Sequence, residues 1–224
     1  MRPWMVYGAV GLAIAALFVV GMMWLDGSPS GSASQAPSRL TAAEVAQVGG
    51  VVGDQPTFYG GVLNPPRPAP EFSLMDQHRQ PFRLQDHRGK VVVLFFGYTT
   101  CPDVCPGTLA HYTRVKELLA DDADRVEFVF ITVDPERDTP ERLAEYMPIF
   151  DEEFYGLTGD REALEAVWSD YGVYVERVED PGPVGYWMNH TALSYVIDPD
   201  GRLRLAHMYG TPVEEVASDL RQLL

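Results

Sequence analysis

The chain has 224 residues, enough for one ordinary domain with further segments around it. Its 32 acidic and 17 basic side chains give a formal net charge of −15, which argues against a nucleic-acid partner because nothing would neutralise the phosphates. A hydrophobic content of 46% is typical of a globular protein with a full core.

The chain begins with an apolar stretch, residues 4–25, which carries no charge and is long enough to cross a bilayer as a helix. The apolar core of a cleaved signal peptide is shorter, about 7–15 residues. Arg2 precedes the stretch and Asp26 follows it, so the positive-inside rule places the short tail in the cytoplasm. We predict that residues 1–26 are a single-pass anchor in the inner (cytoplasmic) membrane, with the soluble domain on the periplasmic or outer side.

A stretch rich in Gly, Ser, Ala and Pro follows the anchor, and residues 27–54 are predicted to be a flexible tether. The compact domain is expected to begin near residue 55. The proline-rich residues 65–70 are predicted to be an extended polyproline segment. A hairpin follows, with arms at 71–75 and 80–84 on either side of a polar turn.

The next elements alternate between strands and helices. Residues 91–96 and 126–133 are mostly apolar and rich in β-branched and aromatic residues, which is typical of strands buried on both faces. Helices are predicted from Cys105 to about Ala120, from Asp138 to about Phe150, from Asp160 to about Tyr171 and from Thr211 onward. Shorter strands are predicted at 156–159, 173–178, 191–198 and 202–208, the last two as a hairpin.

This order of elements predicts the fold class. Strands that alternate with helices form a parallel sheet core, and the closing hairpin adds antiparallel strands. We predict an α/β, thioredoxin-like sandwich with a mixed central sheet over residues 55–224, preceded by one N-terminal transmembrane helix. Sites in open sheets of this kind form at the carboxyl ends of strands, and both Cys101 and Asp134 fall there.

Cys101 and Cys105 are the only two cysteines, and they lie where a central strand ends and a helix begins. The unpaired N–H groups and the dipole of a helix start favour thiolates. A helical turn would place both side chains on one face, where they could hold a soft ion such as Cu(I) or close a disulfide. A permanent structural disulfide is disfavoured, because so short a loop removes little entropy from the unfolded chain.

Five histidines could join the thiols. His190 differs from the others because it lies at the mouth of a loop, immediately before a predicted strand. A neutral imidazole beside two thiolates would give a three-coordinate set that suits copper. From the residues alone, this role of His190 stays open. Surface or packing roles are expected for the other four: His78, His87, His111 and His207.

Four segments occur in order along the chain. They are Gly-Tyr-Thr-Thr-Cys-Pro-Asp-Val-Cys-Pro at 97–106, Val-Asp-Pro-Glu-Arg-Asp-Thr-Pro-Glu at 133–141, Gly-Leu-Thr-Gly at 156–159 and Asn-His-Thr at 189–191. Together they resemble the SCO/SenC family, whose members are membrane-anchored, thioredoxin-fold copper proteins that help to assemble the copper centres of cytochrome c oxidase. The similarity covers residues 55–224, and an anchor ahead of the domain also fits this family.

The resemblance implies that Cys101, Cys105 and His190 are the metal ligands, and that Asp134 lies near the cysteines and orients the site. A turn-forming role for Asp134 before Pro135 is an equally good interpretation. The metal implied is copper, as Cu(I), Cu(II) or both. The function implied is that of a metallochaperone for the CuA-bearing subunit of cytochrome c oxidase rather than an enzyme. Because a disulfide would abolish copper binding, a thiol reductant and a copper donor are expected as partners.

Two alternative functions remain. A thiol–disulfide oxidoreductase that keeps the cysteines of the oxidase copper subunit reduced would need Cys101 and Cys105 as a redox pair, but not His190. A peroxidase of peroxiredoxin type would need one reactive thiol and would explain neither the second cysteine nor the histidine. Replacing His190 separates the first two functions, because only copper binding should be lost.

Overall fold

The computed structural model describes residues 57–224. The predicted anchor (residues 1–26) and almost all of the region ahead of the domain, including the tether (residues 27–54), lie outside the described residues. No helix within residues 57–224 is long and apolar enough to cross a membrane. The anchor and the tether therefore stay predictions from the sequence.

The sheet is built around two buried strands, β4 (Val91–Gly97) and β5 (Val126–Thr132), where the continuous apolar runs predict them. Every residue of β4 is buried, and the two strands pair in parallel over their full length. Parallel strands of this kind have to be covered on both faces, so the fold requires helices on either side of the pair.

The complete sheet has eight strands in the order β1-β10-β9-β4-β5-β6-β2-β3. β5 also pairs in parallel with β6, and the other neighbours are antiparallel. The prediction of a mixed central sheet is therefore confirmed. The remaining strands are β1 Gly61–Pro68, β2 Ser73–Asp76, β3 Pro81–Arg83, β6 Tyr155–Thr158, β9 Leu193–Ile197 and β10 Arg202–Met208.

Two of the helices begin at side chains that cap them. Thr139 and Asp160 each accept a hydrogen bond from a backbone N–H three residues further on, and so cap α4 and α5. The α-helices of the described chain are α3 Val104–Leu119, α4 Pro140–Tyr146, α5 Arg161–Asp170 and α6 Val213–Arg221. Short 3-10 turns are η1 Leu84–His87, η2 Ala120–Arg125 and η3 Met147–Ile149.

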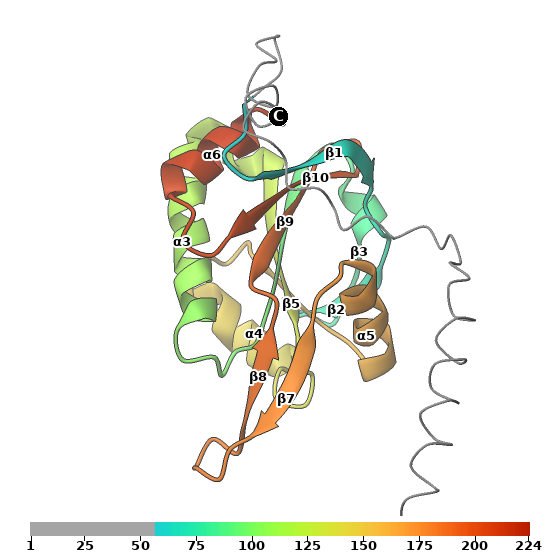
Figure 1. Ribbon diagram of the computed structural model, residues 1–224, viewed down its shortest axis with the longest axis vertical. Coiled ribbons are helices and arrows are strands. Elements are labelled where there is room, and N and C mark those ends of the chain that lie inside the picture. The colour runs from blue at the N-terminus through green and yellow to red at the C-terminus, as the bar shows by residue number, and fades with distance from the viewer. Residues whose placement is uncertain (1–56) are drawn as a thin grey trace, which may run out of the picture. The chain divides into compact units, whose positions relative to one another are not determined.

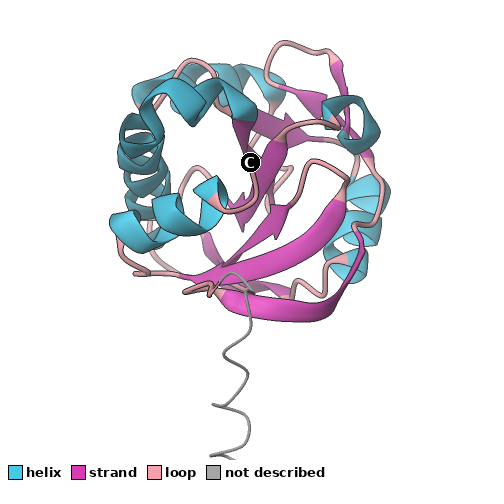
Figure 2. Ribbon diagram, turned by 90° about the horizontal axis from the view of Figure 1, so that it is seen from above, coloured by secondary structure: helices cyan, strands magenta, loops and turns pink. Residues whose placement is uncertain are grey.

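Helices lie on both sides of the sheet, with α3 beside α6 on one face and α5 on the other (Figures 1 and 2). Successive side chains of β4 point to these two faces. The Phe95 ring lies 6.0 Å from that of Phe130, under α3, whereas the Phe96 ring lies 5.9 Å from that of Tyr171, at the end of α5. The alternation along one strand thus fills both halves of the core.

The prediction of a polyproline segment at 65–70 is wrong over most of its length, because Gly61–Pro68 forms β1 and pairs with β10. The strand register shifts between Val62 and Arg67, and the prolines at 65 and 66 lie in this irregular part. An exposed edge strand tolerates prolines there, since they have no N–H to donate to a ladder.

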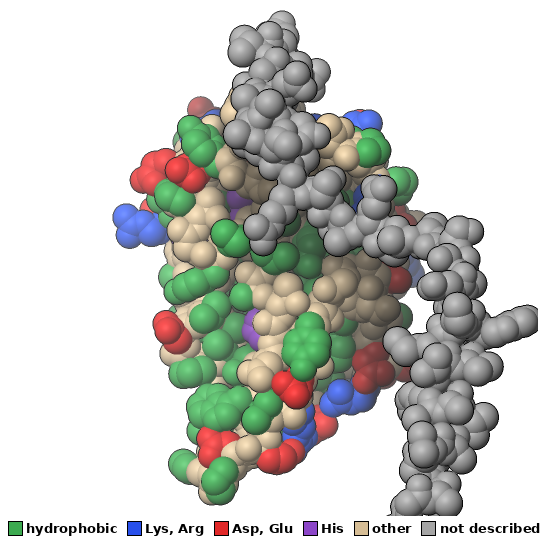
Figure 3. Space-filling model, viewed as in Figure 1, with side chains coloured by type: hydrophobic (Ala, Val, Ile, Leu, Met, Phe, Trp, Pro, Cys, Tyr) green, Lys and Arg blue, Asp and Glu red, His purple; other side chains and the backbone are tan. Residues whose placement is uncertain are grey.

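A two-stranded ribbon, β7 (Val175–Glu179) and β8 (Tyr186–His190), projects from the domain (Figure 1). The sequence predicts the first arm but not the second, because a ribbon that buries little needs no regular alternation of apolar and polar residues. Charged side chains of both signs lie beside hydrophobic ones along it (Figure 3). His190 is therefore the last residue of a strand, opposite Val175, and not part of a loop.

Candidate metal centre

The loop between β4 and α3 carries both cysteines. α3 begins at Val104, so Cys105 lies in its first turn while Cys101 precedes the helix. The prediction that both cysteines share one helical turn is wrong, because Asp103, with φ −142° and ψ −71°, is outside the helical region. Cys101 instead contacts the start of the helix from outside it, since its Sγ accepts a hydrogen bond from the Cys105 N–H at 3.5 Å.

Gly97, the last residue of β4, makes room for the second thiol. Cys105 is fully buried, at 0% exposure, and Cys101 is partly buried. A Cβ at position 97 would lie 2.9 Å from Cys105 Sγ and 2.8 Å from the Phe130 ring. The glycine thus allows the sulfur to sit directly against the end of the central strand.

The two thiols are free and differ in acidity. A hydrogen bond with the Cys105 thiol lowers the pKa of Cys101 to about 5 in spite of partial burial, and the N–H groups at the start of α3 add to this effect. The hydrogen bond with the Cys101 sulfur raises the pKa of Cys105 far above its ordinary value, and burial raises it further. At neutral pH the pair therefore holds one thiolate and one thiol.

His190 reaches this pair from the base of the ribbon. Its Nε2 lies 3.8 Å from Cys105 Sγ, although 85 positions separate the two residues along the chain. Its Nδ1 lies 3.0 Å from the carbonyl oxygen of Thr191, and because a carbonyl only accepts, Nδ1 carries the proton. Nε2 is thereby the ring nitrogen that faces the buried sulfur.

The separation of Nε2 and Sγ would allow both atoms to bind one metal ion. With a metal–sulfur bond of about 2.3 Å and a metal–nitrogen bond of about 2.0 Å, as at zinc, a 120° angle sets the two atoms about 3.7 Å apart. Within residues 57–224, no group of three or more His, Cys, Asp and Glu side chains is assembled as a complete metal site. Cys105 and His190 thus have a spacing that a single ion could bridge, and Cys101 is not assembled with them into a group of three.

A cavity of about 380 Å³ lies between the cysteine loop and the ribbon. Residues 98 and 101–104 line one side of it, and residues 187–190 line the other. The Tyr98 ring meets the His190 ring edge-on, with centroids 5.9 Å apart. Cys101 and His190 therefore border one space, whereas Cys105 is buried and does not line it.

Asp134 lies at the carboxyl end of β5, as predicted, and is buried. Its carboxylate is paired with Arg137 and accepts a hydrogen bond from the Tyr186 hydroxyl at 2.8 Å. These bonds run towards the ribbon rather than to either thiol. The structure thus connects Asp134 with the strand that carries His190, through residues that the sequence did not single out.

Asp138 is a buried carboxylate that the sequence suggests only as part of a helix start. It accepts hydrogen bonds from the Thr99 backbone N–H at 3.1 Å, from the Thr99 hydroxyl at 2.6 Å and from the Thr132 hydroxyl at 2.7 Å. Burial raises the pKa of Asp138, and these hydrogen bonds oppose the shift. Asp138 thereby ties the loop before Cys101 to the end of β5.

The other four histidines lie away from the cavity, as expected. The Nδ1 of His87 contacts Glu127, and its ring stacks on Phe82. The Nε2 of His207 lies 2.9 Å from Asp219 Oδ2, and both side chains are buried. His78 is exposed in the turn between β2 and β3, and His111 lies on α3.

Residues 63–224 match the family model described as SCO1/SenC. The SCO2-like protein of Rickettsia felis is 36% identical over 140 residues, which are 62% of this chain and 68% of that protein. The copper-bound structure of Bradyrhizobium japonicum ScoI is 40% identical, with a TM-score of 0.65, and the match covers 70% of this chain and 99% of that chain. The apo Sco1 of Thermus thermophilus is 39% identical, with a TM-score of 0.69, and the match covers 77% of this chain and 100% of that chain.

Proposed function

The chain belongs to the SCO1/SenC family, and on this basis we propose that it is a membrane-anchored copper metallochaperone. Copper would bind through Cys101, Cys105 and His190, and the protein would assist assembly of the CuA centre of cytochrome c oxidase. The copper-bound relative from Bradyrhizobium japonicum, 40% identical, supports copper as the metal.

The observation that carries this proposal is the 3.8 Å approach of His190 Nε2 to Cys105 Sγ. Disulfide exchange uses only the two sulfurs as reacting atoms, whereas copper binding gives the imidazole nitrogen a role as a third donor. Two sulfurs and one imidazole nitrogen form a donor set that suits Cu(I), and the nitrogen also tolerates Cu(II).

Copper loading would be coupled to protons and to redox state. Thiols must lose their protons before they bind a metal, so loading would release the proton of Cys105, whereas Cys101 is already a thiolate. A disulfide between the two would remove both sulfur ligands. A copper donor and a thiol reductant are therefore the partners we propose, with the CuA-bearing oxidase subunit as the recipient.

The location we propose follows from the N-terminal sequence. Residues 1–26 would cross the inner membrane once and hold the domain on the periplasmic or outer side. Such oxidising compartments favour disulfides, which is why copper binding there requires a reductant.

A thiol–disulfide oxidoreductase is the second candidate. The low pKa of Cys101 beside the buried Cys105 thiol favours it, because a partly accessible thiolate and a buried resolving thiol are typical of dithiol exchange. This function would keep the cysteines of the oxidase copper subunit reduced and would not need His190 as a ligand.

Cu(I) titration of the reduced full chain in detergent, against a coloured Cu(I) chelator, separates the two functions. We expect His190→Ala to weaken copper binding while disulfide exchange with a small dithiol stays at the wild-type rate. His78→Ala is the matched control, because His78 is exposed and lies outside the cavity. Wild-type copper affinity in His190→Ala would show that the ligand assignment is wrong.

A further inference from the structure

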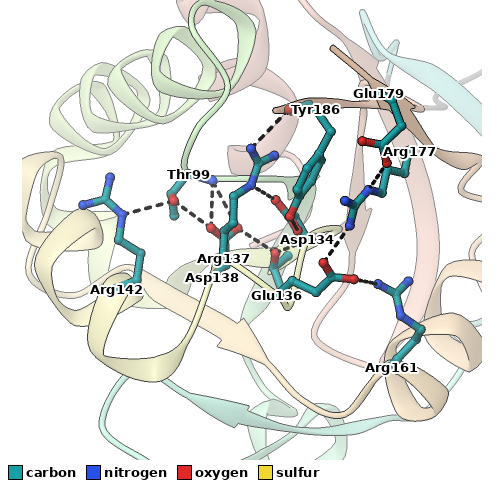
Figure 4. A network of polar contacts seen from close by, with 11 residues as sticks. Thr99, Asp134, Glu136, Arg137, Asp138, Arg142, Arg161, Arg177, Glu179 and Tyr186 are labelled. Atoms are coloured by element: carbon teal, nitrogen blue, oxygen red, sulfur yellow. Dashed lines mark hydrogen bonds and ion pairs between the residues drawn. The ribbon is translucent and has the colours of Figure 1, made fainter. Parts of the chain in front are cut away.

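Tyr186 begins β8 and lies four residues before His190. The guanidinium carbons of Arg137 and Arg177 each lie 3.7 Å from the centroid of its ring. Two cations at this distance have to occupy opposite faces of the ring, and Figure 4 shows one arginine on either side of it. Such cation–π contacts are attractive, so the ring is held from both faces.

The edge and the backbone of Tyr186 are held as well. Its hydroxyl donates to Asp134 Oδ1 at 2.8 Å, and Arg137 donates from Nη1 to the Tyr186 carbonyl oxygen at 3.2 Å. Arg137 is also paired with Asp134, so one turn after β5 supplies contacts to the ring, the hydroxyl and the main chain (Figure 4). Burial is the larger cause and the hydrogen bond to Asp134 the second cause of a rise in the pKa of Tyr186 to about 12. The hydroxyl therefore keeps its proton at neutral pH.

Ion pairs of Arg177 connect the stack of Arg137, Tyr186 and Arg177 to α5. Arg177 donates to Glu136 at 2.7 Å, and Arg161 of α5 donates to the other oxygen of Glu136 at 3.0 Å. Arg177 also pairs with Glu179 on its own strand at 2.7 Å. Exposed pairs such as these contribute little on their own, but they fix the plane of the guanidinium that covers Tyr186.

Two routes lead from this stack to the imidazole of His190. The first is β8 itself, which runs about 13 Å from Tyr186 to His190 at the usual rise of a strand. The second passes through Tyr98, because the Arg137 guanidinium lies 5.7 Å from the Tyr98 ring, and the Tyr98 ring meets the His190 ring at 5.9 Å. Arg137 is common to both routes.

We propose that Arg137, Tyr186 and Arg177 form a ribbon clamp that holds the imidazole of His190 at the distance from Cys105 that copper binding requires. These are positioning residues, and Asp134 acts on the metal centre through them rather than by contact with the thiols. The inference rests on the proposed function, since it assumes that His190 is a ligand. The ribbon packs outside the sheet, so the clamp affects the histidine more than the core.

The test is a double-mutant cycle of Cu(I) affinity on the reduced full chain in detergent. Tyr186→Ala should weaken binding about tenfold, as loss of a group that orients a ligand typically does. In a chain that already carries His190→Ala, the same change should have no further effect, because the clamp then has no ligand to position. Tyr174→Ala is the matched control, since Tyr174 also adjoins the ribbon but is 60% exposed.

Further variants separate positioning from folding. Tyr186→Phe keeps the stack and loses only the bond to Asp134, so it should recover most of the affinity. Arg177→Ala removes one face of the stack from a side chain that is 39% exposed, so it should weaken copper binding without unfolding the domain. The alkylation rate of Cys101 should stay at the wild-type value in all of them.

Two results would overturn the clamp while leaving the proposed function intact. In the first, His190→Ala weakens copper binding but Tyr186→Ala and Arg177→Ala bind like the wild type. In the second, Tyr186→Ala weakens binding equally with and without His190. Wild-type affinity in His190→Ala itself would instead overturn the proposed ligand set, and the inference with it.

Discussion

Gly97 and Cys105 meet at a contact that leaves no room for a side chain on the glycine. The Cys105 sulfur would lie 2.9 Å from a Cβ at position 97, closer than real Cβ atoms approach another heavy atom. The end of the central strand and the buried thiol are thus fitted to one another, and the position of the sulfur depends on the backbone of β4.

Gly97→Ala should therefore destabilise the domain by about 1–3 kcal/mol, as overpacking of a filled core does, and should also displace the thiol and weaken copper binding. Urea denaturation and Cu(I) titration measure the two effects. Gly61→Ala is the control, because its nearest contact would be an ordinary 3.5 Å. Equal stability of Gly97→Ala and the wild type would show that the thiol is not confined as described.

Alkylation of Cys101 by iodoacetamide should follow a titration with its midpoint near the pKa of about 5. The thiolate is the reactive form, so the rate should be nearly constant between about pH 6 and 8, which is roughly one to three units above that midpoint. Cys105→Ala removes the hydrogen bond that contributes most, so it should move the midpoint upward. A wild-type midpoint of about 8.5, which is the ordinary pKa of a free cysteine, would contradict this prediction.

Glu127 should make the stability of the domain depend on acid pH. Burial alone would raise the pKa of this carboxyl, but hydrogen bonds from His87 and Lys90 outweigh burial and hold the pKa below its ordinary value. A lowered pKa stabilises the fold above the unfolded value of about 4.3, and this stabilisation is lost as the pH falls through the folded pKa.

Glu127→Gln should accordingly cost about 1–2 kcal/mol at pH 7, and the difference from the wild type should shrink as the pH falls below about 4. Urea denaturation across this pH range measures it. Glu117→Gln, on the exposed face of α3, is the control and should behave like the wild type. A difference that persisted at acid pH would show that the charge of Glu127 is not responsible.

Asp219 and His207 should matter for stability and not for the metal. Asp219 is 0% exposed, accepts hydrogen bonds from the N–H groups of Tyr59 and Gly60, and lies 2.9 Å from His207 Nε2. Asp219→Asn leaves these groups poorly satisfied and should cost about 2 kcal/mol. The copper affinity of Asp219→Asn should stay unchanged, and Asp121→Asn on the surface is the control. A loss of copper affinity in Asp219→Asn would show that the Asp219–His207 pair affects the metal centre.

The parts of the fold that follow from local pattern could be predicted from the sequence. The apolar run of β4 predicts a buried central strand, and Asp160 predicts the start of α5. β1 and β8 could not be predicted in this way, because an exposed edge strand and a projecting ribbon bury too few side chains to impose an alternating pattern.

The candidate metal centre likewise has parts that the sequence predicts and parts that it does not. The apolar run before Cys101 and Cys105 predicts their position at the end of a strand. The resemblance to the SCO/SenC family implies the role of His190. The bond of Asp134 to Tyr186 could not be predicted, because it joins residues 52 positions apart through the pairing of the ribbon. The non-helical backbone of Asp103, which separates Cys101 from α3, likewise leaves no mark in the spacing of the cysteines.

X-ray absorption spectroscopy at the copper edge of the Cu(I)-loaded, reduced protein tests the central claim most directly, namely that His190 completes a ligand set with the two thiols. The account predicts two sulfur neighbours and one nitrogen neighbour in the wild type, and loss of the nitrogen in His190→Ala. A copper ion surrounded by sulfur alone in the wild type would contradict it.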